Sequence, residues 1–172
     1  AMGPAMEAAI LAARQECDSI GGVIQCAVLG LPAGVGGPDF GENLEGELAR
    51  ALFAVPAVKG VAFGAGFALA QMRGSQANDP FCMDGGTVCT RTNHNGGING
   101  GISNGMPVVF TAAIKPTPSI SQPQATVNFR TGEETTLTIK GRHDPCIVPR
   151  AVVVVEAAPA LNIWNLLEGP HQ

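Results

Sequence analysis

The feature that most constrains this 172-residue chain is the segment "GGINGGISNG", residues 96–105, in which five of ten positions are glycine. Glycine lacks a Cβ atom, so such a segment can turn tightly into a strand, or it can bring main-chain N–H groups close to a flat or anionic ligand. It is not a phosphate-binding P-loop, because no Lys-Ser/Thr pair follows the glycines. On the glycines alone, both interpretations stay open.

The overall composition excludes several classes of protein. Apolar residues make up 45% of the chain and charged residues 14%, which excludes a disordered chain and indicates more apolar surface than one small domain buries. The net charge is −4 and the ten basic residues form no run, so we predict no nucleic-acid partner. The longest apolar stretch, residues 147–161, is interrupted by Pro149, Arg150, Glu156 and Pro159, so we predict no membrane span.

The five cysteines show no C-x-x-C spacing, and the nearest pair, Cys82 and Cys89, is not spaced like zinc ligands. We therefore predict no metal site, reduced thiols and a cytoplasmic protein. Residues 1–6 look like a cloning remnant, and residues 7–172 are predicted to form a single compact unit. The chain is expected to be a piece of a longer protein.

The hydrophobic pattern predicts an α+β fold, with helices packed on an antiparallel or mixed sheet. Leu44, Leu48 and Leu52 recur at helical spacing behind Asn43, a candidate N-cap. Expected helices span residues 7–17, 43–54 and 149–167, the last kinked near Pro159, with a short helix ending at residue 72. Expected strands span residues 21–29, 58–67 and 106–115, and a hairpin joins 126–129 to 135–139. Residues 73–101 are expected to be a long connection with little periodicity.

Three further segments allow both a structural and a functional interpretation. "FGAGFALA" is not a dinucleotide fingerprint, because Leu69 stands where a small residue must let the helix pack closely. The prolines in Lys115–Ser119 hold an extended backbone that either leaves a strand or offers a lysine and hydroxyls to a ligand. Arg142, His143 and Asp144 form either a surface ion pair or part of a site.

Seven segments together resemble the chorismate synthase family, in its order and spacing, from about Asp18 to Leu167. They are "CDSIGGVIQC", "LPAGVGGPDF", "AVKGVAFGAGF", "RGSQANDPF", "NHNGGINGGISNGMP", "IKPTPSI" and "GRHDPCIVPRAV". The resemblance implies half of a β-α-β sandwich and a homotetramer. It also implies a lyase that eliminates phosphate from 5-enolpyruvylshikimate 3-phosphate in an anti-1,4 sense, giving chorismate. This is the last step of the shikimate pathway of aromatic amino acid biosynthesis, and it requires reduced FMN.

The resemblance also implies the site residues. Flavin contacts fall on Pro56, Ala57, Gly100, Lys115, Pro116, Thr117, Pro118, Ser119 and Arg142. Arg142 also matches a residue at the substrate, and Asp144 matches the acid that manages a proton at flavin N5 as a general base. We therefore expect the segments around Gly100, Lys115 and Arg142 to converge on one wall of a flavin cleft.

The family's N-terminal half, with two functional histidines and most substrate arginines, has no counterpart in this sequence. We therefore expect a C-terminal portion that is inactive alone and binds FMN weakly or not at all. The alternatives are a natural short flavin-binding module without catalysis, and an assembly module that pairs with another copy. Some family members reduce their flavin with NADPH, but nothing here indicates an NADP site, so that question stays open.

Overall fold

The computed structural model describes residues 3–141 and 143–168, and its centre is an antiparallel sheet of three strands in the order β1-β7-β2. These strands are β1 (Gly22–Val28), β2 (Val58–Phe63) and β7 (Val108–Ile114). Every second residue of β7 is buried, which gives the period of two expected for a strand with one face on the core. Gly22 and Val58 both pair with Ile114, so the three strands share one end.

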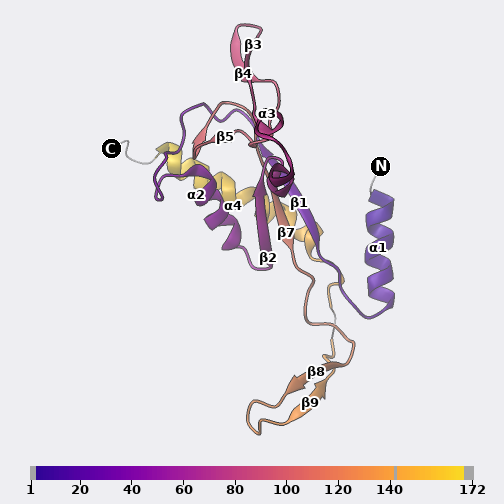
Figure 1. The fold of residues 1–172 in the computed structure, drawn as a ribbon. Coiled ribbons are helices and arrows are strands. Elements are labelled where there is room, and N and C mark those ends of the chain that lie inside the picture. The colour runs from indigo at the N-terminus through magenta and orange to yellow at the C-terminus, as the bar shows by residue number, and fades with distance from the viewer. Residues whose placement is uncertain (1–2, 142, 169–172) are drawn as a thin grey trace.

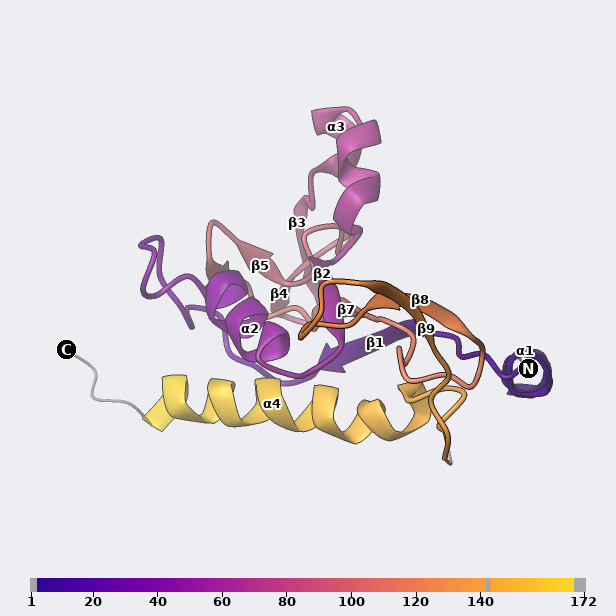
Figure 2. The same cartoon turned by 90° about the horizontal axis from the view of Figure 1, so that it is seen from below.

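Two helices, α2 (Leu44–Phe53) and α4 (Val148–Glu168), cover one face of this sheet (Figure 2). The α2 prediction is confirmed: its three leucines are fully buried, and the Asn43 side chain accepts a hydrogen bond from the Gly46 N–H at 2.9 Å. Leu52 of α2 and Val155 of α4 meet Phe110 of β7 in a single cluster. The core therefore lies between β7 and the two helices.

Helix α4 confirms the prediction of a helix over residues 149–167, although its "VVVV" run is typical of strands. Its buried side is formed by Val155, Pro159 and Ile163, while Val153 and Trp164 are 64% and 60% exposed. By length and composition α4 could cross a bilayer, and core helices of soluble proteins pass the same test. The absence of a membrane partner therefore stays a prediction.

The remaining elements lie beside this core or project from it (Figure 1). They are α1 (Gly3–Gln15), η1 (Gly66–Gln71), α3 (Gly74–Ala77), β3 (Phe81–Asp84), β4 (Thr87–Thr90), β5 (Ile98–Asn99), β6 (Ile102–Ser103), β8 (Gln124–Val127) and β9 (Glu134–Leu137). The last six strands form three separate hairpins, and the β8–β9 hairpin was predicted. All described sheets are antiparallel, which confirms the α+β fold class.

Three expectations need correction. The first helix begins at Gly3 instead of residue 7, and β2 ends at Phe63 because Gly64, at φ +54°, turns the chain away. The connection 73–101 is not without regular structure, since it contains the β3–β4 hairpin. Gly85 and Gly86, at φ +54° and +87°, supply the two left-handed residues that a tight hairpin turn requires.

A buried carboxylate ties the base of the β3–β4 hairpin to the segment before the glycine-rich turn. Asp79 is 4% exposed and accepts hydrogen bonds from the N–H groups of His94 and Asn95 at 2.8 Å. The Thr92 hydroxyl donates at 2.7 Å and the Asn95 side-chain amide at 3.0 Å. Burial raises the pKa of the Asp79 carboxyl, but these four donors outweigh it and hold the pKa below its ordinary value.

Candidate functional site

Two of the predicted segments meet at the end of the sheet that the three strands share. Because Val58 pairs with Ile114, the turn before β2 lies beside the segment that leaves β7, and the Lys115 N–H donates to the Ala57 carbonyl at 2.9 Å. Ala57 has a φ of +75°, a left-handed conformation that non-glycine residues rarely adopt outside functional or tightly constrained turns. Pro56, Ala57 and the Lys115–Ser119 segment thus lie together.

The chain before β1 links this pair of segments to Asp144. The Ser19 hydroxyl donates to the Thr117 carbonyl at 2.6 Å, and the Ile20 N–H donates to the Pro145 carbonyl at 2.8 Å. A Cβ atom on Gly21 would lie 2.2 Å from the Ile114 carbonyl oxygen, so only glycine permits the contact. Hydrogen bonds therefore join the turn at Ala57, the Lys115–Ser119 segment and the residues next to Asp144 at the end of the sheet that the three strands share.

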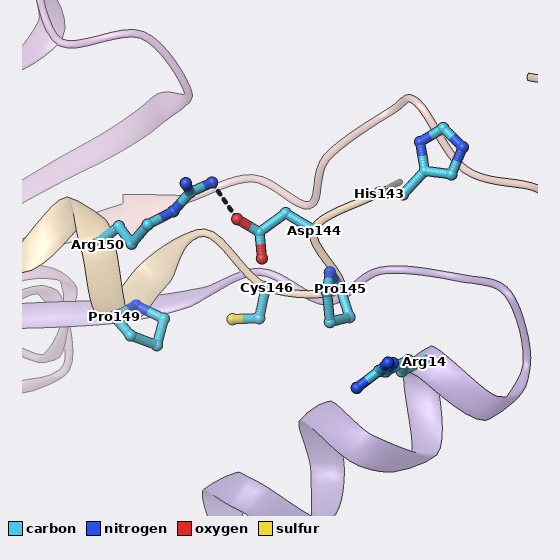
Figure 3. Close-up of a pocket in the computed structure, with 7 residues that line it drawn as sticks. All are labelled: Arg14, His143, Asp144, Pro145, Cys146, Pro149 and Arg150. Carbon is cyan, nitrogen blue, oxygen red and sulfur yellow. Dashed lines mark hydrogen bonds and ion pairs between the residues drawn. The ribbon is translucent and has the colours of Figure 1, made fainter. Parts of the chain in front are cut away.

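A cavity of about 740 Å³ opens beside Asp144 (Figure 3). It is lined by Arg14, His143, Asp144, Pro145, Cys146, Pro149 and Arg150. The Asp144 carboxylate, with 32% of its side chain exposed, accepts an ion-paired hydrogen bond from Arg150 in the first turn of α4. The His143 ring points away from this pair, and its Nε2 lies 3.1 Å from the Ile139 carbonyl oxygen.

The charges of this cavity suit an anion. Two guanidinium groups, of Arg14 and Arg150, stand against the one carboxylate of Asp144. Guanidinium binds carboxylates and phosphates through paired N–H donors, and a carboxylate can accept or return a proton. The described residues contain no group of three or more His, Cys, Asp or Glu side chains that could hold a metal ion. The cavity can therefore bind an anion and move a proton beside it.

Both arginines were missed by the sequence reasoning. Arg150 lies in the quoted motif "GRHDPCIVPRAV", six residues after Asp144, so its proximity to the acid was a usable signal. Arg14 belongs to α1 and carries no local signal. Only the path of the chain from α1 into β1 brings it to the cavity.

The expectation that Gly100 joins this site is wrong within a single chain. Gly100 lies in the turn between β5 and β6, and the Val109 N–H donates to the Gly96 carbonyl at 3.1 Å, at the start of β7. Lys115 follows the other end of β7, and a seven-residue strand spans roughly 20 Å at about 3.3 Å per residue. No atom lies within 4 Å of the position that a Cβ of Gly100 would occupy, so the main chain of this turn is open to approach. The turn nevertheless lies at the opposite end of the sheet from Lys115. Arg142 lies outside the described residues.

Comparison with known proteins gives a consistent family. A family profile described as Chorismate synthase matches residues 1–167. The chain is 55% identical over 161 residues to chorismate synthase of Dehalococcoides mccartyi, covering 94% of this chain and 44% of that protein. It is 57% identical over 159 residues to that of Methanocella arvoryzae, covering 92% and 42%. A solved structure titled "Crystal Structure of Chorismate Synthase" superimposes with a TM-score of 0.77 at 29% identity, covering 96% of this chain and 42% of the other. The chain thus spans less than half the length of the relatives it matches.

Proposed function

Because this chain belongs to the chorismate synthase family, we propose that it supplies part of the site at which phosphate is eliminated from 5-enolpyruvylshikimate 3-phosphate to give chorismate. The observation that carries this proposal is the joining of Ala57, the Lys115–Ser119 segment and Asp144 at one end of the sheet, beside a cavity with two arginines. The reaction makes the protein a carbon–oxygen lyase of the shikimate pathway. The cytoplasmic location and the homotetramer remain predictions.

The residues present fit the reduced FMN that the family implies. The Thr117 hydroxyl oxygen is buried and has no hydrogen-bond partner among the described residues, so a polar atom is left for a ligand or water. Lys115 and Ser119 add an ammonium and a hydroxyl, and the turn Pro56–Ala57 adds main-chain groups. These residues would hold the flavin. When bound, reduced FMN supplies transient electron donation that helps phosphate leave.

The cavity residues carry the proposed acid–base and binding chemistry. Asp144 holds or accepts a proton, and its ion pair with Arg150 fixes the direction in which the carboxylate points. Arg14 faces the same cavity and is suited to a carboxylate or phosphate of the substrate. Arg150 therefore positions the proposed proton acceptor, and Arg14 attracts the anion that has to reach it.

The chain alone is proposed to be inactive, because it spans 44% of the Dehalococcoides mccartyi relative and further substrate contacts are expected in the remainder. The experiment is a chimera in which the matched 161 residues replace their counterpart in that relative. We expect the chimera to form chorismate in the presence of reduced FMN, and the isolated chain to form none. Turnover with tight flavin binding by the isolated chain would refute this part of the proposal.

Asp144→Asn in the chimera tests the role of the carboxylate. A general base contributes about 10²- to 10⁴-fold, so we expect the elimination rate to fall by about that factor while substrate still binds. Asp84→Asn, at the exposed last residue of β3, is the matched control, and its rate should equal that of the unmodified chimera. An Asp144→Asn chimera with an unchanged rate would remove Asp144 from the mechanism.

A further inference from the structure

Two cysteines face each other across the β3–β4 hairpin. Cys82 and Cys89 are direct partners in the antiparallel register, and their Sγ atoms lie 3.3 Å apart. Direct partners in an antiparallel pair have Cα atoms about 4.5–5.5 Å apart, within the range of about 4.4–6.8 Å that a disulfide spans. Bond formation between these sulfur atoms therefore requires no change in the strand pairing.

The hairpin is also accessible and held at both ends. It projects from the body of the molecule (Figure 1), and Phe81, Met83 and Val88 are each at least 60% exposed. The turn Gly85–Gly86 closes one end, while Asp79 fixes the segment that follows the other end. The two thiols are thus kept in register, and because Cys82 and Cys89 are only partly buried, a small disulfide reagent in solution can reach them.

We propose that Cys82 and Cys89 form a reversible disulfide by exchange with a low-molecular-weight disulfide such as glutathione disulfide. The thiolate of one cysteine attacks a glutathione sulfur, which gives a mixed disulfide and releases one glutathione. The second cysteine then attacks the protein sulfur of that mixed disulfide and releases the second glutathione. The protein loses two electrons and two thiol protons, and glutathione disulfide is reduced to two glutathione thiols.

The two strands that the cross-link would join form one wall of a groove of about 600 Å³, which lies between the β3–β4 hairpin and the β5–β6 hairpin. Phe81 and Val88 line one wall, and Asn99 and Ile102 line the other. Side chains alternate along a strand, so the two sulfur atoms lie on the hairpin face opposite Val88. A disulfide therefore joins the two strands that carry one wall while leaving the groove itself open.

The test is equilibration of the reduced chain with glutathione and glutathione disulfide at about 0.1 mM each, followed by an acid quench and trypsin digestion. Both cysteines fall in one tryptic peptide, residues 74–91, which has no internal Lys or Arg. Thiols held in register act at an effective concentration of millimolar or more. We therefore expect a disulfide form of this peptide, lighter by two hydrogens, that exceeds the glutathione adduct of the same peptide by at least about tenfold. Dithiothreitol should convert the disulfide form back to the dithiol.

The controls show whether disulfide formation depends on the folded hairpin or only on the short distance between the two cysteines in the sequence. Cys82→Ser and Cys89→Ser each leave one thiol in the hairpin, which should only be glutathionylated, the outcome also expected for the exposed Cys17. In urea, the ratio of the disulfide peptide to its glutathione adduct should be several-fold lower, because the unfolded strands no longer hold the two cysteines in register. A wild-type peptide that carries mainly glutathione adducts would overturn the proposal. A ratio of disulfide peptide to glutathione adduct that urea leaves unchanged would overturn it as well.

Discussion

At the residue scale, Asp79 shows how one buried charge can fix the path of a glycine-rich segment. Its carboxylate receives four hydrogen bonds from a stretch of four residues, Thr92 to Asn95. These donors replace the water that the carboxylate loses on burial, and they set the approach to the glycines at 96 and 97. The sequence reasoning did not single out Asp79, because its partners lie 13–16 residues away and nothing local marks it.

Asp79→Asn is expected to destabilise the fold by about 2 kcal/mol or more, because an amide replaces acceptors of charge-assisted hydrogen bonds with a group that also donates. The folded pKa of Asp79 lies below its unfolded value. Its stabilisation is therefore fully present above the unfolded pKa, about 3.9, and is lost as the pH falls through the folded pKa. Urea unfolding of wild type and variant across this pH range measures the difference.

The exposed Asp84 of the same hairpin provides the comparison for this prediction. Asp84→Asn should unfold within about 0.5 kcal/mol of the wild type, since surface substitutions remote from buried networks have small effects. If Asp79→Asn were as stable as Asp84→Asn at neutral pH, the four hydrogen bonds would not stabilise the hairpin base.

At the element scale, α2 depends on the residue that caps its N-terminus. Asn43 adopts an extended conformation, and its side-chain oxygen accepts from the Gly46 N–H, a donor that the helix itself cannot satisfy. Asn43→Ala should therefore lower the free energy of unfolding by about 1 kcal/mol. Circular dichroism during urea unfolding is the measurement. Asn43→Asp keeps the acceptor and should stay close to wild type, and equal losses in both variants would show that the cap is not the cause.

Elements whose signals are local were predictable. Helix α2 combines leucines at helical spacing with a capping residue, and the structure reproduces both. The β3–β4 hairpin carries an equally local signal, because "CMDGGTVC" places an Asp-Gly-Gly turn between two short extended runs. It was missed because the surrounding Gly, Asn, Asp and Thr residues were interpreted as a loop by composition. In α4, burial of one side against the sheet outweighs the strand preference of consecutive valines.

The candidate site was predictable only in part, because its assembly depends on strand pairing. The motif resemblance identified Ala57, Lys115 and Asp144, but their joining follows from the register of β2 against β7 and from the path of residues 18–21. The same register separates Gly100 from Lys115 by the full length of β7. No property of either segment taken alone could have revealed this separation.

At the scale of the whole molecule, the chain consists of a packed centre with hairpins standing off it. The β8–β9 hairpin extends away from the sheet (Figure 1), and every residue of β9 is exposed. The apolar excess in the composition lies largely outside the core, on surfaces such as the outward side of α4 with Val153, Leu161 and Trp164. Composition could predict that such a surface exists, but not which helix carries it.

This arrangement predicts the order of proteolysis. Trypsin should cut first at Arg130, in the exposed turn of the β8–β9 hairpin, because cleavage needs a locally opened backbone. Arg50 is the internal comparison, since 72% of its side chain is exposed but its backbone lies within α2. Mass spectrometry of a brief digestion gives the order, and cleavage at Arg50 as early as at Arg130 would contradict the structure.

The central place of β7 has a further consequence for the segment that continues it. Because β7 is bonded on both sides, and Lys115 is bonded again to Ala57, the main chain entering Lys115–Ser119 has little freedom left to lose. A ligand that docks there gains its contacts at almost no entropic cost from ordering the protein, as in any preorganised receptor. Substitutions that loosen the pairing of β7 should therefore weaken affinity even when every contacting side chain is retained.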